Sequence, residues 1–139
     1  MSDETRLKVL LIGGGNIAGA FDEGRSRDAR PLSHAGAYVR DGRFILSACV
    51  EPDAVCNAAF RAHWPVESML SDIDDIPADA SYDIISICSP THLHAAHLER
   101  ALQFKPRLVF CEKPLTPDLQ ASTLLVERFE QAGIAMAVN

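Results

Sequence analysis

The sequence predicts an α/β protein with a doubly wound parallel β-sheet, covered by helices on both faces. Segments with strand composition alternate with segments of helical character along the whole chain, an order typical of parallel sheets. The strand segments are continuous aliphatic runs, as expected of strands buried on both faces. The first run breaks at Gly13 into three glycines, which predicts a tight turn between a strand and a helix.

In the first half of the chain, capping residues and breakers define the elements. A polar stretch closed by proline, Asp22–Pro31, predicts an inserted loop that interrupts the helix after the glycine turn. Ser33 is a suitable N-cap for the resumed helix, which Asp41-Gly42 should end. Trp64-Pro65 should end the next helix. The elements expected here are strand 7–12, helix 34–41, strand 44–50, helix 54–63, strand 66–68 and a short acidic helix 69–76.

In the second half, the run Ile84–Cys88 is the clearest strand, and Ser89-Pro90-Thr91 should turn it into a helix. Thr116-Pro117-Asp118 predicts another helix start, with Thr116 as N-cap and Pro117 at the first helical position. Gly133 should end that helix. The elements expected here are strand 84–88, helix 92–102, strand 108–111, helix 117–132 and strand 134–138.

The composition excludes several classes of protein. At 139 residues the chain has the length of one domain. The formal net charge is −6 and the basic residues are scattered, so neither nucleic acid nor an anionic membrane is an expected partner. No apolar run is as long as a membrane span, and the polar N-terminus is not that of a secretory signal. We therefore expect a cytoplasmic protein.

The glycine turn has the G-x-G-x-x-G/A spacing of a dinucleotide-binding, Rossmann-type βαβ unit. Gly13 should form the tight turn, Gly15 should let the backbone approach a pyrophosphate, and Ala18 should let the helix pack on the strand. Asn16 and Ile17 begin that helix, whose free N–H groups favour a phosphate. The alternative is a glycine turn in a fold that binds no dinucleotide.

Glu51 ends the second expected strand, at the sheet edge where such folds bind their ligands. There its carboxylate can accept hydrogen bonds from the adenosine ribose, and its charge would repel the 2′-phosphate of NADP. We therefore expect NAD, with NADP less favoured. The alternative is a surface carboxylate that caps the next helix, a role for which Asp53 is equally suitable.

Histidines and cysteines are the remaining candidates for chemistry. His94 and His97 lie three residues apart on a helix, but no carboxylate or cysteine completes a ligand set, so we expect no metal site. Instead, the backbone of Ser89 and Pro90 should line the cofactor, His94 should border the pocket, and His92 and His97 should be surface residues. Four cysteines without paired spacing should be reduced thiols, three of them small buried residues: Cys49, Cys88 and Cys111.

Glu112-Lys113-Pro114 follows another buried strand, which places a carboxylate and an ammonium at the same sheet edge. A lysine there can donate to a substrate hydroxyl. The alternative is a solvated Glu and Lys before the next helix.

Three motifs carry a resemblance to a known family. In order and spacing, Gly13–Ala18, Ser89–His94 and Cys111–Leu115 resemble the glycine loop, the T-P-N-x-x-H turn and the E-K-P motif of the Gfo/Idh/MocA family. The resemblance covers nearly the whole chain. It implies NAD(P)-dependent oxidation or reduction of sugar or cyclitol hydroxyls. It also implies that Lys113 is catalytic, that Glu112 supports the nicotinamide end, and that His94 lines the pocket.

The chain departs from the family pattern at several points. Ser89 replaces the usual Thr, Thr91 stands at the Asn position, and Asp22–Pro31 is an insertion. Family enzymes also continue into an α/β domain that supplies the substrate pocket and a catalytic Asp or His. We therefore expect residues 1–139 to be the cofactor-binding domain, without the substrate domain and without turnover of its own.

Two other functions remain open from the sequence. One is a non-catalytic module that senses NAD or another nucleotide. The other is a methyltransferase-like domain, since glycine loops also hold S-adenosylmethionine, although the E-K-P turn argues against it. The expected partners are the dinucleotide and, in the full-length enzyme, a sugar-like substrate. A homo-oligomer is compatible with the sequence.

Overall fold

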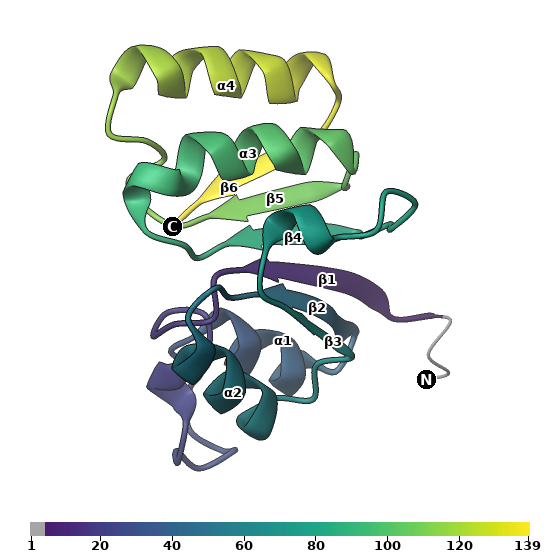
Figure 1. The fold of residues 1–139 in the computed structure, drawn as a ribbon, viewed down its shortest axis with the longest axis vertical. Helices are drawn as coiled ribbons and strands as arrows, with labels where there is room; N and C mark the ends of the chain where they lie inside the picture. The colour runs from purple at the N-terminus through teal and green to yellow at the C-terminus, as the bar shows by residue number, and fades with distance from the viewer. Residues whose placement is uncertain (1–4) are drawn as a thin grey trace.

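The computed structural model describes residues 5–139, which form a six-stranded parallel sheet between two layers of helices (Figure 1). The strand order is β3-β2-β1-β4-β5-β6, and every neighbouring pair is parallel. This order reverses between β1 and β4, so the predicted doubly wound fold is confirmed. The strands are β1 (Leu7–Ile12), β2 (Phe44–Val50), β3 (Ser68–Leu70), β4 (Ile84–Ile87), β5 (Leu108–Cys111) and β6 (Ala135–Val138).

Four α-helices of the described residues cover the sheet: α1 (His34–Asp41), α2 (Ala54–His63), α3 (His94–Gln103) and α4 (Leu119–Gln131). Alternate residues of β1 face opposite layers. Leu10 and Ile12 belong to a core cluster with residues of α3 and α4, whereas Val9 and Leu11 belong to one with residues of α1 and α2. All four are at most 1% exposed, which explains why this strand is a continuous aliphatic run.

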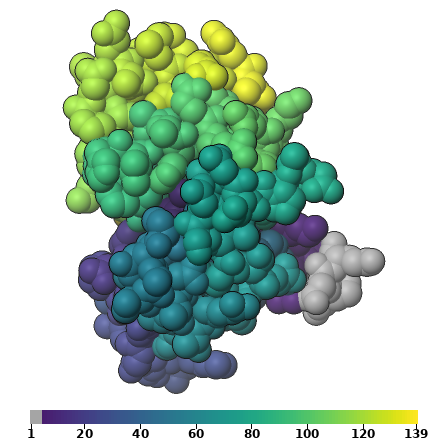
Figure 2. All heavy atoms as spheres, viewed as in Figure 1, coloured from purple at the N-terminus to yellow at the C-terminus, as the bar shows by residue number. Residues whose placement is uncertain are grey.

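The helix after the glycine turn is interrupted, as predicted, but its hydrogen bonds continue across the interruption. The N–H groups of His34 and Ala35 donate to the carbonyls of Ile17 (3.0 Å) and Ala18 (2.8 Å). The first residues of α1 therefore follow the turn at Asn16–Gly19 as the next turn of one helix would. The residues between, including the short 3₁₀ helix η2 (Ala20–Asp22), protrude as a loop at the bottom of the molecule (Figures 1 and 2).

The carboxylate of Asp22 closes this loop at its base. It accepts hydrogen bonds from the N–H groups of Leu32 and Ser33 and from the Ser33 hydroxyl, and Arg25 lies 3.4 Å away. Burial alone would raise the pKa of Asp22, but these hydrogen bonds and the Arg25 charge lower it below its ordinary value. The inserted loop is therefore anchored at both ends.

Two predictions of local structure were wrong between α2 and β4. The short strand is residues 68–70 rather than 66–68, because its register is set by pairing with Ala48–Val50 of β2. The expected acidic helix is only a 3₁₀ turn, η3 (Ile73–Asp75). Ile76 is extended, as is usual before a proline, so the helix cannot continue into Pro77.

Helix starts were predicted with small errors. Ser33 caps α1 as expected, accepting a hydrogen bond from Gly36 N–H. However, α4 begins two residues later than predicted, with Asp118 rather than Thr116 as N-cap, because the Asp118 carboxylate accepts from Ala121 N–H (2.8 Å). A 3₁₀ turn, η4 (Thr91–Leu93), precedes α3.

Cys49, Cys88 and Cys111 are buried at strand ends, and all four cysteines are free thiols. Burial raises the pKa of these three thiols, to about 12 for Cys111. They therefore remain protonated and pack as small apolar residues. No helix within residues 5–139 has the length and apolar character needed to cross a membrane.

Candidate functional site

The predicted site residues meet at the carboxyl edge of the sheet, where β1, β2, β4 and β5 end side by side. Gly13 has a φ of 99°, a conformation that side chains disfavour. A Cβ added there would lie 2.7 Å from the backbone of Cys88 and Ser89. The glycine turn is therefore pressed directly against the turn that follows β4.

The glycine turn presents free backbone N–H groups. Within residues 5–139, the N–H groups of Gly15, Asn16 and Ile17 donate to no protein acceptor, whereas the carbonyls of Gly15, Asn16 and Ile17 are all occupied. A Cβ added at Gly15 would meet no atom within 4 Å, so this side of the turn faces open space. Unpaired N–H groups at the start of a helical turn form an anion site, and this cradle therefore fits a phosphate.

Glu51 is bound to the same turn. Its Oε2 accepts a hydrogen bond from Gly14 N–H at 2.7 Å, and its Oε1 accepts one from Asp53 N–H at 2.9 Å. Each carboxylate oxygen can accept a second hydrogen bond, so the side chain keeps capacity for a ligand hydroxyl. Asp53 itself caps α2 by accepting from Cys56 N–H, so the two acidic residues have separate roles.

A cavity of about 330 Å³ opens beside the glycine turn. This volume lies within the range of small-molecule sites. The lining residues come from the ends of β1, β2 and β4, from the segment after β3, and from η4 and α3: Ile12, Gly13, Val50, Glu51, Pro52, Ser71, Asp72, Ile73, Ser89, Pro90, Leu93 and His97.

His97 was expected on the surface but is half-buried in this cavity wall. Its Nδ1 lies 2.7 Å from the Ser89 hydroxyl. Burial, with a smaller contribution from the charge of His94, lowers the pKa of His97. The neutral ring can accept a hydrogen bond from the Ser89 hydroxyl and so fix the direction of that hydroxyl. His92, by contrast, is exposed as expected.

His94 lies beneath the site rather than in the cavity wall. It is 1% exposed, and its ring nitrogens face the carbonyl oxygens of Ser89 (2.8 Å), Pro114 (2.9 Å) and Leu115 (3.2 Å). One side chain therefore joins the turn after β4 to the turn after β5. In the described part of the chain, no cluster of three or more His, Cys, Asp or Glu side chains could hold a metal ion.

The turn after β5 places two different side chains at the sheet edge. Glu112 is 9% exposed, with its carboxylate bound by His34 and Asn139. Lys113 is exposed, and its ammonium makes no hydrogen bond or ion pair with residues 5–139. The Lys113–Pro114 peptide bond is cis. The turn after β5 therefore offers an anchored carboxylate, Glu112, next to a free ammonium group, Lys113.

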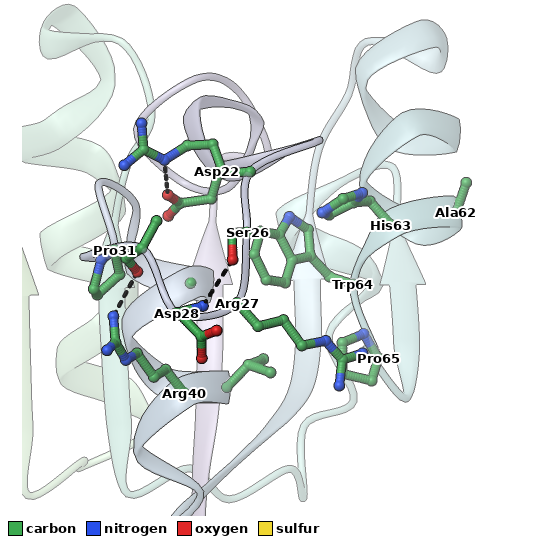
Figure 3. A pocket seen from close by; sticks show the side chains of 14 residues that line it. Asp22, Ser26, Arg27, Asp28, Pro31, Arg40, Ala62, His63, Trp64 and Pro65 are labelled. Atoms are coloured by element: carbon green, nitrogen blue, oxygen red, sulfur yellow. Dashed lines mark hydrogen bonds and ion pairs between the residues drawn. The ribbon is translucent and has the colours of Figure 1, made fainter.

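A larger cavity, about 830 Å³, lies away from the strand ends. In Figure 3 the inserted loop, with Ser26 and Arg27, faces Trp64 and Pro65 at the end of α2. None of the predicted site residues lines it. We therefore place the candidate site at the carboxyl edge of the sheet rather than here.

The residues that support Glu112 were not predicted from the sequence. His34, Ser86, Tyr38 and Asn139 form one hydrogen-bonded group with it. One signal was present in the sequence, because Ser86 is the polar residue within the aliphatic run of β4. A hydroxyl buried there must have a partner, but the sequence does not say which.

Comparisons with known proteins agree with this geometry. Residues 7–139 match the family described as the GFO_IDH_MocA oxidoreductase family, NAD-binding Rossmann fold. The inositol 2-dehydrogenase of Corynebacterium glutamicum (strain R) is 37% identical over 82 residues, which are 59% of this chain and 24% of that protein. The chain spans about a quarter of the length of the curated relatives it matches.

Solved structures share the fold. An NAD binding oxidoreductase from Klebsiella pneumoniae is 26% identical with a TM-score of 0.74, over 97% of this chain and 34% of that one. An oxidoreductase from Agrobacterium radiobacter in complex with NAD+, L-tartaric acid and magnesium is 23% identical with a TM-score of 0.80, over 97% and 35%. The family match covers nearly every described residue, and the chain therefore belongs to the Gfo/Idh/MocA oxidoreductase family, as an NAD-binding Rossmann fold.

Proposed function

We propose that this chain is the NAD-binding domain of a longer dehydrogenase that acts on a hydroxyl group of a sugar or cyclitol. The observation that carries the proposal is the convergence of the glycine turn, Glu51 and Glu112-Lys113 on one sheet edge. They lie on both sides of the point where the strand order reverses, which is where doubly wound sheets bind dinucleotides. The substrate class follows the relatives named as inositol 2-dehydrogenases.

In this proposal the N–H groups of Gly15, Asn16 and Ile17 hold the pyrophosphate, and Gly13 provides the turn that presents them. Glu51 accepts hydrogen bonds from the adenosine ribose, and its charge disfavours the extra phosphate of NADP.

The neighbouring cavity, with Ser89 and Pro90 in its wall, takes the adenine. His94 supports cofactor binding indirectly. Its ring contacts the carbonyls of Ser89 and Pro114 and so holds the two turns that face the cofactor. The adenosine half of the dinucleotide therefore lies over β2 and the nicotinamide half over β5.

Lys113 is the proposed catalytic residue. The bound nicotinamide supplies the hydride acceptor or donor. The free ammonium of Lys113 donates a hydrogen bond to the reacting oxygen of the substrate, while Glu112 keeps the turn in place beneath it. A residue of a separate substrate domain handles the proton and completes the pocket wall.

Calorimetry of the 139-residue chain with NAD, NADP and S-adenosylmethionine tests the cofactor assignment. We expect binding of NAD, weaker binding of NADP and none of S-adenosylmethionine. Absence of NAD binding would overturn the proposal.

The catalytic assignment is tested in the intact protein that contains this chain, by NADH formation with myo-inositol and a panel of sugars. Lys113→Ala should lower the rate by about 10²-fold or more and change NAD affinity little. Lys8→Ala is the matched control, because Lys8 is exposed at the opposite end of β1. An unchanged rate in the Lys113 variant would show that this lysine is not catalytic.

A further inference from the structure

A buried chain of hydrogen bonds runs from α1 through β4 to the end of β5. The Tyr38 hydroxyl lies 2.7 Å from the Ser86 hydroxyl, which lies 3.2 Å from His34 Nδ1. His34 Nε2 lies 2.7 Å from Glu112 Oε1. Ser86 is fully buried and His34 is 6% exposed, so the chain is shielded from water. Its members are all satisfied by one another, as buried polar groups require.

The partners fix the direction of donation along this chain. Burial raises the pKa of Tyr38, so its hydroxyl keeps its proton and can donate to Ser86. The carboxylate of Glu112 can only accept, so His34 Nε2 carries the proton that faces it, and Nδ1 can accept a hydrogen bond from the Ser86 hydroxyl. This tautomer is assigned from the hydrogen-bond partners of the ring. It gives Glu112 an N–H donor that is shielded from water.

Glu112 has a second donor on its other side. Asn139 Nδ2 lies 3.0 Å from Oε1 and 3.2 Å from Oε2. Oε1 therefore receives donors from both His34 and Asn139, whereas Oε2 receives only Asn139 and can accept one more hydrogen bond. The backbone N–H of Glu112 also donates to the Ile87 carbonyl. The residue just before Lys113 is thus held at its backbone and at its side chain.

His34 also connects this carboxylate to the glycine turn. Its backbone N–H donates to the Ile17 carbonyl at 3.0 Å, while its ring bonds to Glu112. The phosphate cradle and the turn after β5 are therefore linked through a single residue at the start of α1. The inserted loop does not disturb this link, because it protrudes before His34.

We propose that His34 is a positioning residue that holds Glu112 and, through it, the Lys113 turn against the nicotinamide half of the dinucleotide. This inference rests on the proposed function, which places the nicotinamide over β5. The adenosine half over β2 lies beyond β1 and β4 from Glu112, so it should not sense the loss of His34. If His34 positions the Lys113 turn, its loss should weaken only interactions with the nicotinamide half. If His34 is instead needed for folding, its loss should weaken binding of both halves.

The experiment compares NAD with ADP-ribose, which lacks the nicotinamide ring, by calorimetry on the 139-residue chain. His34→Ala should weaken NAD binding by about tenfold and leave ADP-ribose binding within about threefold. His34→Gln, whose amide can donate to Glu112, should recover part of the NAD affinity. His63→Ala is the matched control and should leave both affinities unchanged, because His63 is an exposed histidine at the end of α2, outside the hydrogen-bonded group around Glu112.

A second measurement covers the case in which His34→Ala does not fold. If His34 acts through Glu112, the double variant His34→Gln/Glu112→Gln should bind NAD no more weakly than Glu112→Gln alone. Additive losses in that cycle would overturn the inference, as would equal losses of NAD and ADP-ribose in a folded His34→Ala protein. Failure of the unmutated chain to bind either ligand would instead overturn the proposed function.

Discussion

The carboxylate of Glu51 accepts a hydrogen bond from the backbone N–H of Gly14 at 2.7 Å, which joins the end of β2 to the glycine turn after β1. Gly14 is in close contact with this side chain, since a Cβ added to it would lie 3.1 Å from the Glu51 Cβ. The acidic residue is thus fixed in position before any ligand binds. Its charge is the feature expected to distinguish NAD from NADP.

Replacing Glu51 by Gln should narrow the preference for NAD over NADP. The amide oxygen can still accept from Gly14 N–H, but the negative charge that repels a 2′-phosphate is gone, a change on the order of 1 to 3 kcal/mol in relative binding free energy. Calorimetric titration with both cofactors measures the ratio of the two affinities. Glu67→Gln, exposed at the far end of the sheet before β3, is the control and should leave the ratio unchanged. Equal affinity of the unmutated chain for both cofactors would refute the assignment.

Gly13 and Gly15 should respond differently to substitution. Gly15→Val should abolish NAD binding while far-UV circular dichroism stays near native, because its Cβ meets no protein atom within 4 Å and points into the space assigned to the pyrophosphate. Gly13→Ala should instead destabilise the fold. The φ of Gly13 is 99°, which disfavours a side chain, and the added Cβ would lie 2.7 Å from the backbone of Cys88. If Gly15→Val binds NAD as well as the parent, the phosphate does not lie on this turn.

His94→Ala should lower the free energy of unfolding by about 1–3 kcal/mol, because it removes a buried ring whose nitrogens contact the carbonyl oxygens of Ser89 and Pro114. Urea denaturation followed by circular dichroism gives this value. His92→Ala, an exposed neighbour, should change stability by less than about 0.5 kcal/mol. Equal stability of the two variants would show that His94 does not hold the two turns together.

The half-buried His97 should make stability depend on pH. Its pKa in the folded chain is lowered, chiefly by burial, below the ordinary value of 6.5, so below that pH the unfolded chain binds the proton more readily. The stability that comes from keeping His97 neutral is fully present above pH 6.5 and is lost as the pH falls from there through the lowered pKa of the folded chain. Between about pH 7.5 and 5.5, the free energy of unfolding should therefore fall more for the parent than for His97→Gln. Parallel curves for the two proteins would contradict this expectation, and the exposed His92→Gln is the control.

Much of the fold was predictable because it depends on local properties. A strand buried on both faces must be aliphatic along its whole length, so the runs at residues 7–12 and 108–111 matched β1 and β5. Ser33 was recognisable because a cap satisfies an N–H group only three residues away. Where the local sequence pattern was weak, pairing with residues far along the chain set the bounds of an element. Pairing with β2, for example, set the register of β3.

The fold class, the glycine turn and the sheet edge at which Glu51, Ser89 and Lys113 gather could all be predicted from residue types, because each follows from burial and strand direction. The contacts that hold these residues in place came from the packing of distant elements. The partner of Glu112 is His34, 78 positions earlier in the chain, and it reaches the carboxylate only because α1 resumes on the carbonyls of Ile17 and Ala18. Hydrogen bonds between distant residues depend on how elements pack, and no local pattern of residue types encodes that packing.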